Sequence, residues 1–270
     1  MNRLLAIRRI RNCLRSGGAS IGSWMQLPYS SVAEIMGQSG YDWVAIDMEH
    51  GSVCVNQLPD LFRALELGGT LPLARIARGD SLDCKQALDA GAGGVIVPMI
   101  ETAEELTAVR DACRWPPSGV RGVGFSRANL YGRFFENYHE EAQCPLLIAM
   151  IENIRAIGNL ESILQVDGLD AIMIGPYDLS ASMGIPGEFD NPKFQKVLTQ
   201  IIGLCELHKI SCGFHLVDPS PVELNSKISE GFQFIAYSID AVFLRTACLN
   251  ISNNLDDPRV ELKKSIFIQE

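Results

Sequence analysis

The sequence predicts an α/β chain folded as a (β/α)8 TIM barrel with an extra N-terminal helix. Eight short runs rich in Val, Ile, Leu and Ala alternate with helix-like segments between residues 19 and 250. Such apolar runs are typical of parallel strands that are buried on both faces. A doubly wound open sheet is the alternative, but no glycine fingerprint follows the first run. The length of 270 residues suits one barrel domain.

The expected strands are residues 19–26, 42–49, 71–76, 93–99, 145–152, 171–176, 211–217 and 234–240. Helix-like patterns separate them, and several end in glycine, which often stops a helix. These patterns cover residues 31–40, 57–69, 82–91, 103–114, 159–166, 192–208 and 223–232.

The two ends of the chain differ from the barrel pattern. Residues 1–18 contain five arginines and no acid, and Leu4, Leu5, Ile7, Ile10 and Leu14 share one side of a helix that ends at the glycines 17–18. A mitochondrial transit peptide has a similar composition. We favour the helix, because a strand follows directly. Residues 251–270 are expected to form a polar C-terminal tail on a single domain that spans residues 1–270, with the barrel at 19–250.

Composition excludes several classes of partner. The net charge of −9 argues against nucleic acid and anionic membranes as partners. No run of 18 apolar residues occurs, so no membrane span is expected. The eight cysteines contain no C-x-x-C pair, which indicates reduced, packed thiols and a cytoplasmic location.

One segment interrupts the alternation. Residues 115–143 are rich in aromatic residues and arginine and are too long for a plain connection between helix and strand. They form either a functional loop or subunit contact, or an insertion that packs on the barrel.

Ionisable residues gather where the predicted strands end. A barrel of this class carries its active site at the C-terminal ends of its strands. Charged groups are costly in a core, so their concentration at one rim indicates a functional mouth. The residues at these ends are Trp24, Gln26, Asp47, Glu49, His50, Arg75, Glu152, Asp178, His215 and Asp240.

Two carboxylates at this rim are candidate metal ligands. Glu152 and Asp178 follow adjacent strands, and oxygen ligands with water and substrate suit Mg²⁺ or Mn²⁺. The alternative is that they cap the helices that follow.

His50 and Arg75 are the other candidates for chemistry. His50 suits a base near neutral pH, and Asp47, three residues upstream, is placed to hold its imidazole. Arg75 has the fork geometry that binds a carboxylate or an enolate oxygen. The alternatives are a structural histidine and a salt bridge from Arg75 to a rim acid such as Glu49.

The lysines exclude one kind of chemistry. All seven, at positions 85, 193, 196, 209, 227, 263 and 264, fall outside the expected strands. A Schiff-base lyase needs a lysine inside the barrel. The phosphate-binding motif G-x-x-x-x-G-K is also missing. A barrel that stabilises a carbanion without such a lysine would use a divalent metal.

The order of these motifs resembles the HpcH/HpaI aldolase family, the metal-dependent class II pyruvate aldolases. The resemblance runs from about residue 19 to 250 and rests on D-x-E-H, E-N and G-P-x-D-L-S in strand order. The stretches that carry it are GYDWVAIDMEHG (40–51), PLARI (72–76), KQALDAGAGGVIVPMIETAEE (85–105), RWPPSGVRGVG (114–124), IENIRAIGNLESILQVDGLDAIMIGPYDLSASMG (151–184) and FQFIAYSID (232–240).

The resemblance implies a role for each matching residue. His50 is the base, preceded by Asp47 and supported by Asp89; Arg75 steadies the enolate. Glu152 and Asp178 hold Mg²⁺, Mn²⁺ or Co²⁺. The backbone of Gly175, Pro176 and Tyr177 meets the pyruvate carboxylate, and the substrate side of the mouth includes Trp24, Arg75, Met150 and Asp178.

Two positions depart from the family pattern. Met150 stands where a glutamine that contacts the 2-oxo acid is common, and Tyr177 stands where a small residue is common. Met150 lacks the hydrogen-bond donor, and Tyr177 adds bulk and a hydroxyl. Both changes concern substrate identity rather than the class of reaction.

The implied activity is carbon–carbon cleavage of a 4-hydroxy-2-oxo acid, such as a 2-keto-3-deoxy sugar acid or a hydroxy-oxo-dioate, to pyruvate and an aldehyde through a metal-stabilised enolate. The family also implies a homo-oligomer, a hexamer or trimer of dimers with exchanged C-terminal helices. A related lyase or decarboxylase that acts on another 2-oxo acid or a CoA thioester, and a catalytically silent binding barrel, are the alternatives.

Overall fold

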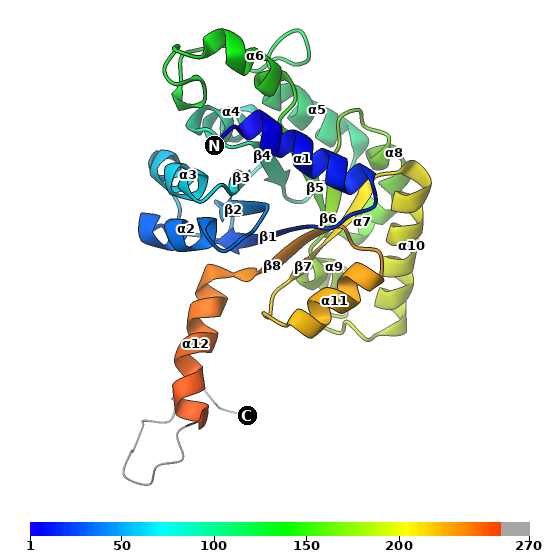
Figure 1. Ribbon diagram of the computed structural model, residues 1–270. Helices are drawn as coiled ribbons and strands as arrows, with labels where there is room; N and C mark the ends of the chain where they lie inside the picture. Colours follow the sequence, from blue (N-terminus) through cyan, green and yellow to red (C-terminus); the bar gives the residue numbers. More distant parts are fainter. Residues whose placement is uncertain (255–270) are drawn as a thin grey trace, which may run out of the picture.

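Eight parallel strands close into a barrel in chain order (Figure 1). The computed structural model describes residues 1–254, and the side chains of residues 1–249. All eight predicted strands are confirmed, each shorter than its apolar run because the flanking residues leave the ladder. The strands are β1 (Ser20–Met25), β2 (Trp43–Asp47), β3 (Leu71–Arg75), β4 (Gly94–Val97), β5 (Leu146–Ile151), β6 (Ala171–Ile174), β7 (Ser211–Leu216) and β8 (Phe234–Ile239).

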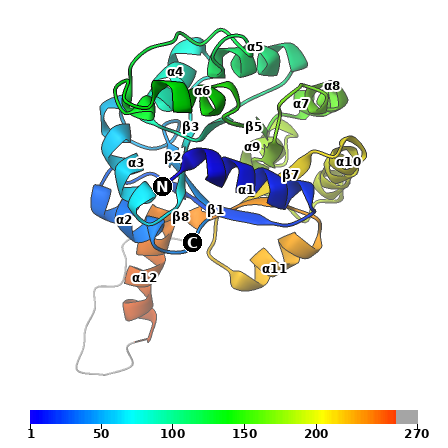
Figure 2. The same cartoon turned by 45° about the horizontal axis from the view of Figure 1, so that its top comes forward.

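Helices surround the barrel, as the alternating pattern predicts (Figure 2). The expected helix at 159–166 is the short helix α8, and α6, α7, α9 and α12 were not among the predicted helices. The helices are α1 (Arg3–Arg15), α2 (Ser30–Gly37), α3 (Leu58–Leu67), α4 (Ser81–Ala90), α5 (Ala103–Cys113), α6 (Phe135–Gln143), α7 (Ile154–Gly158), α8 (Leu160–Leu164), α9 (Pro176–Ser182), α10 (Pro192–His208), α11 (Pro221–Ser229) and α12 (Asp240–Asn254).

The predicted N-terminal helix lies across the end of the barrel where the strands begin (Figure 2). Ile7 and Ile10 are buried in the same cluster as the residues that fill the barrel interior, among them Trp43 and Phe234. Leu5, expected on the apolar side, is 58% exposed and lies outside this contact. The helix therefore closes the barrel opposite the mouth.

The segment 115–143 packs on the molecule around a small core of its own. Trp115 and Tyr138 meet edge to face at 5.2 Å between ring centroids, and both are buried. Arg3 of α1 donates to Glu141 of α6 at 2.7 Å, which ties the segment to the N-terminal helix. Its outer surface exposes Val120, Phe125 and Tyr131.

The last described helix, α12, leaves the barrel after β8 and projects away from it in both views (Figures 1 and 2). The first residues of the expected polar tail at 251–270 continue this helix to Asn254. Residues 255–270 lie outside the described part of the chain. None of the described helices is long and apolar enough to cross a membrane.

Candidate active site

A cavity of about 200 Å³ opens at the C-terminal ends of the strands. Eight of its residues come from strand ends or from the first residues after them, which is where the sequence placed the mouth. The lining residues are Gln26, His50, Arg75, Met150, Gly175, Pro176, Tyr177, Asp178, His215, Val217 and Ile239. We refer to this cavity as the mouth.

A buried ion pair forms the floor of one side of the mouth. Asp47 ends β2 and Arg75 ends β3, and the two residues are direct partners in the strand register. Arg75 donates from Nε to Oδ1 of Asp47 at 2.9 Å and from Nη2 to Oδ2 at 2.5 Å. Gln26 Nε2 donates to the same Oδ2 at 2.8 Å, and the guanidinium lies 4.5 Å from the centroid of the Trp24 ring. Three residues from β1, β2 and the residue after β1, namely Trp24, Asp47 and Gln26, thus fix the guanidinium of Arg75.

The expectation that Asp47 holds the imidazole of His50 is wrong. The carboxylate of Asp47 bonds Arg75, and its Oδ1 accepts the backbone N–H groups of Glu49 and His50, each at 3.1 Å. Burial raises the pKa of Asp47, but the hydrogen bonds and charge of Arg75 outweigh burial, so its pKa lies below the usual value. Asp47 is an ionised anchor for Arg75 and for the turn that carries His50.

The acid nearest to His50 is Glu49. Its Oε2 lies 4.0 Å from Nε2 of His50, and the His50 side chain is 60% exposed at the mouth. The same oxygen lies 3.4 Å from Nη1 of Arg75, so the salt bridge that the sequence offered as the alternative role of Arg75 is present. Burial raises the pKa of Glu49, against the opposing charges of Arg75 and His50. Glu49 therefore links the exposed imidazole to the buried guanidinium.

Asp89 does not lie beside His50 within this chain. It stands near the end of α4, the helix that runs from the end of β3 back towards the start of β4. Its carboxylate faces Arg121, with Oδ1 at 3.9 Å from Nη1, rather than the imidazole. The match in sequence did not reveal how far Asp89 lies from His50. The expectation that Asp89 supports His50 is therefore wrong within a single chain.

Glu152 is a buried acid directly after β5 whose two oxygens have different neighbours. Oε1 accepts the backbone N–H of Met99 at 2.7 Å. A Cβ added at Gly175 would stand 2.7 Å from Oε2, so only glycine leaves room for this carboxylate. Burial raises the pKa of Glu152 to about 7, opposed by the Met99 N–H and reinforced by the charges of Glu49 and Asp178.

This accumulation of negative charge fits a divalent cation. Glu152 and Asp178, in the first turn of α9, supply carboxylate oxygens of the kind that Mg²⁺ and Mn²⁺ prefer. Within residues 1–254, no three His, Cys, Asp or Glu side chains converge as a closed metal cage. A cation held here would therefore use two protein carboxylates and keep positions for water or substrate.

The remaining predicted substrate residues lie around this centre. Met150 Sδ is 3.9 Å from Nη1 of Arg75. Tyr177 is 55% exposed at the lip, and its ring meets that of Phe189 at 4.9 Å between centroids. Trp24 is buried under Arg75 and faces the substrate only through that guanidinium.

Four contributors to the mouth were missed as site residues. Gln26 and His215 stand at strand ends that the sequence had marked but were assigned no contact, and Glu49 was named only as the alternative partner of Arg75. Met99 contributes a backbone N–H, and its φ of +54° is a conformation that sequence does not reveal. Asp240, also expected at the rim, instead accepts the backbone N–H groups of Gln26 and Leu27, each at 2.9 Å.

Comparison with known proteins defines the class of this chain. A model of the HpcH/HpaI aldolase/citrate lyase family matches residues 20–247, and the chain belongs to that family. A crystal structure of an HpcH/HpaI aldolase/citrate lyase family protein from Burkholderia cenocepacia J2315 has a TM-score of 0.86 and 27% identity, covering 92% of this chain and 99% of that one.

Two curated relatives carry a more specific description. The 2-keto-3-deoxy-L-rhamnonate aldolase of Klebsiella pneumoniae is 39% identical over 250 residues, which are 92% of this chain and 92% of that protein. The 2-keto-3-deoxy-L-rhamnonate aldolase of Salmonella gallinarum is 36% identical over 269 residues, 98% of this chain and 96% of that protein.

Proposed function

We propose that this chain is a class II pyruvate aldolase that cleaves a 2-keto-3-deoxy sugar acid to pyruvate and an aldehyde. The observation that carries the proposal is the meeting, at one rim of the barrel, of a guanidinium fixed by Asp47 with the carboxylates of Glu152 and Asp178. This arrangement supplies positive and metal-binding groups where an enolate would form. The curated aldolase relatives support the substrate class.

Glu152 and Asp178 are the residues that would hold a divalent cation, Mg²⁺, Mn²⁺ or Co²⁺. When bound, such a cation supplies Lewis-acid polarisation of the 2-oxo acid. The first-turn N–H groups of Tyr177 and Asp178, at the positive end of α9, are suited to the carboxylate of that acid.

Arg75 has one terminal nitrogen, Nη1, that is not bonded to Asp47 and faces weaker partners. Its Nε and Nη2 are committed to Asp47, whereas Nη1 faces only Glu49 at 3.4 Å and the sulfur of Met150 at 3.9 Å. Nη1 therefore donates to the oxygen on which negative charge develops. Because Asp47, Gln26 and Trp24 hold the guanidinium already, little reorganisation is needed during the reaction.

His50 acts as the base. It accepts the proton of the 4-hydroxyl as the C3–C4 bond breaks, and the bonding electrons pass to the 2-oxo group to give the pyruvate enolate. The aldehyde leaves, and protonation of C3 completes pyruvate. Aldol addition follows the reverse course. Glu49 stabilises the imidazolium that forms between these steps, since its Oε2 lies 4.0 Å from Nε2.

The test is pyruvate release from a panel of 4-hydroxy-2-oxo acids that includes 2-keto-3-deoxy-L-rhamnonate, with Mg²⁺, Mn²⁺ or Co²⁺ and then with EDTA. We expect metal-dependent release that falls by about 10²–10⁴-fold in His50→Ala. His139→Ala, on the exposed face of α6, is the matched control. Folded protein that releases no pyruvate with any metal would contradict the proposal, and cleavage of a CoA thioester would favour the related lyase.

We also propose that the enzyme is a homo-oligomer, a hexamer or trimer of dimers. Support comes from the exposed apolar side chains Val120, Phe125 and Tyr131 on the segment 115–143, and from the projection of α12 away from its own barrel (Figure 1). Light scattering at micromolar concentration tests this, and a monomer would contradict it.

A cytoplasmic location completes the proposal. All eight cysteines are free thiols, four of them exposed or half-buried at positions 13, 54, 144 and 248. Thiols of this kind persist in a reducing compartment.

A further inference from the structure

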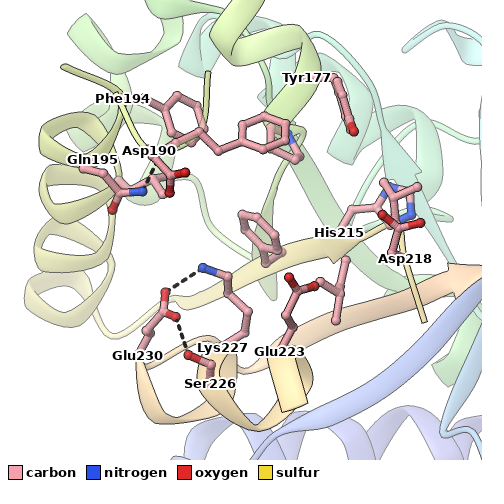
Figure 3. Close-up of a pocket in the computed structure, with 16 residues that line it drawn as sticks. Tyr177, Asp190, Phe194, Gln195, His215, Asp218, Glu223, Ser226, Lys227 and Glu230 are labelled. Carbon is pink, nitrogen blue, oxygen red and sulfur yellow. Dashed lines mark hydrogen bonds and ion pairs between the residues drawn. The ribbon is translucent and has the colours of Figure 1, made fainter. Parts of the chain in front are cut away.

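A second and larger cavity adjoins the mouth. It has a volume of about 430 Å³ and lies over β7, between α10 and α11; we call it the side groove (Figure 3). Pro176, Tyr177, His215 and Val217 line both the side groove and the mouth. The two cavities therefore share one wall, and a substrate bound at the mouth has a direct route into the side groove.

The side groove combines aromatic faces with free carboxylates. Phe189, Phe194 and Phe214 contribute rings, and Asp190 and Glu223 stand at its edge (Figure 3). Neither of these two carboxylates has a hydrogen-bond or ion-pair partner among the described residues. A hydroxylated carbon chain matches this surface, because its C–H faces pack on rings and its hydroxyls donate to carboxylates.

The charge of the side groove disfavours anions. Lys227 is the one lysine or arginine in the lining, and its Nζ already pairs with Glu230 Oε2 at 2.7 Å. The same ammonium lies 4.9 Å from the centroid of the Phe214 ring. Lys227 and Arg245, which lies 3.7 Å from Asp218, offset two of the four acids Asp190, Asp218, Glu223 and Glu230. The lining stays negative, so a phosphate or a second carboxylate would be repelled.

His215 stands where the two cavities meet. Its ring packs edge to face on Trp24, with 5.6 Å between centroids, and its Nε2 is buried without a hydrogen-bond partner among the described residues. Buried polar atoms in folded proteins nearly always have a partner. A hydroxyl of a bound chain that passes from the mouth into the side groove would supply one.

We propose that the side groove is the subsite for the aldehyde half of the substrate, and that this half is a neutral polyhydroxylated chain. His215 and Glu223 are its specificity-determining residues: His215 lies where the two cavities meet, and Glu223 stands on α11 between His215 and Lys227 (Figure 3). The proposal rests on the proposed aldolase function and narrows its substrate range. Aldehydes that bear a phosphate or a carboxylate are disfavoured, so a sugar acid is favoured over a hydroxy-oxo-dioate as the substrate.

The experiment measures kcat/KM for aldol addition of pyruvate to glycolaldehyde, glyceraldehyde, erythrose, glyceraldehyde 3-phosphate and succinic semialdehyde. We expect a rise of about tenfold or more from glycolaldehyde to erythrose, and a preference of similar size for glyceraldehyde over its phosphate. Oxaloacetate decarboxylation is measured in parallel, because it passes through the same enolate and needs no aldehyde.

Four variants test the assignment. Glu223→Gln and His215→Leu should each lower the erythrose-to-glycolaldehyde ratio of kcat/KM by about fivefold or more, and His215→Gln should restore part of the loss. Glu223→Lys should shift preference towards glyceraldehyde 3-phosphate. Glu104→Gln, an exposed acid on α5, is the matched control and should leave every ratio unchanged.

The outcomes separate the two proposals. One outcome is an enzyme that catalyses both decarboxylation and aldol addition, with addition rates that do not depend on the hydroxyl groups of the aldehyde or that favour the anionic aldehydes. That result would overturn the side-groove subsite and leave the aldolase function intact. Folded enzyme that shows neither decarboxylation nor aldol addition would overturn the proposed function and the subsite that rests on it.

Discussion

Arg75 and Asp47 face each other across neighbouring strands and share two hydrogen bonds, at 2.9 and 2.5 Å. Both side chains are nearly inaccessible to solvent, so the pair is a buried one. A buried pair that loses one partner leaves an uncompensated charge, which costs far more than the loss of a surface pair. Asp47 thus fixes the orientation of the guanidinium that we propose for catalysis, and it also compensates the buried charge of Arg75.

Asp47→Asn should therefore destabilise the protein by about 3 kcal/mol and remove the fixed orientation of Arg75. Urea unfolding measures the first effect, and oxaloacetate decarboxylation measures the second, with an expected loss of about 100-fold in kcat.

Asp60→Asn is the matched control. Asp60 pairs with Arg63 one turn along α3, and its side chain is 69% exposed. Surface pairs of this kind contribute about 0.5 kcal/mol or less. Equal unfolding midpoints for the Asp47 and Asp60 variants would show that the Asp47–Arg75 pair contributes no more than a surface pair.

The neutral state of His215 predicts a pH dependence of stability. Burial lowers the pKa of His215 to about 3, assisted by the charge of Arg75 and opposed by that of Asp47, whereas an unfolded histidine titrates near 6.5. Between pH 3 and 6.5 the unfolded chain binds the extra proton, so stability rises with pH across this window and is lost as pH falls.

His215→Gln should flatten this slope. Between pH 4 and 6, the slope of the unfolding free energy against pH should differ between wild type and variant by nearly one proton, or about 1.4 kcal/mol per pH unit. Urea unfolding at several pH values measures these slopes. His139→Gln, a substitution on the exposed face of α6, serves as control. Identical slopes for wild type and His215→Gln would show that His215 titrates alike in the folded and unfolded chains.

Sequence reasoning located the mouth but not the contacts within it. The strands were predictable because each is a continuous apolar run, and the order of strands then placed Asp47, Arg75, Glu152 and Asp178 on one rim. The partner of Asp47 was not predictable, because spacing along the chain favoured His50, three residues away. Strand register instead sets Asp47 opposite Arg75, 28 residues away.

Two other features needed three-dimensional packing. The segment 115–143 is held by the contact of Trp115 with Tyr138, which are far apart in sequence and carry no shared pattern. The side groove arises because α10 and α11 diverge over β7, and its lining comes from separate elements. A single sequence specifies which side chains exist near the mouth, but not which of them enclose a cavity.

A substitution at Gly175 would disturb Glu152, the acid we propose as a metal ligand, without changing Glu152 itself. A Cβ at this position would stand 2.7 Å from Glu152 Oε2, and the backbone φ of −91° suits alanine. Gly175→Ala should therefore fold with a change within about 1 kcal/mol, yet weaken Mn²⁺ binding by about tenfold because the carboxylate must move. Titration calorimetry with Mn²⁺ measures the affinity.

Gly203→Ala, in the interior of α10, controls for the same substitution. Nothing lies within 4 Å of a Cβ at Gly203, so alanine should stabilise the helix by about 0.5–1 kcal/mol and leave Mn²⁺ affinity unchanged. Equal Mn²⁺ affinities for the two variants would argue against Glu152 as a ligand.

The N-terminal helix should contribute to the stability of the whole barrel. Ile10 is 1% exposed and packs with the residues that fill the barrel interior, so Ile10→Ala removes buried apolar area and leaves a cavity at the closed end. The expected loss is about 2–5 kcal/mol, in a single cooperative unfolding transition if α1 folds with the barrel.

Leu5→Ala, at a position that is 58% exposed on the same helix, is the matched control and should change stability by less than about 0.5 kcal/mol. An Ile10→Ala variant as stable as the Leu5→Ala variant, or one in which α1 melts separately while the barrel stays folded, would mean that α1 rests on the barrel without closing it.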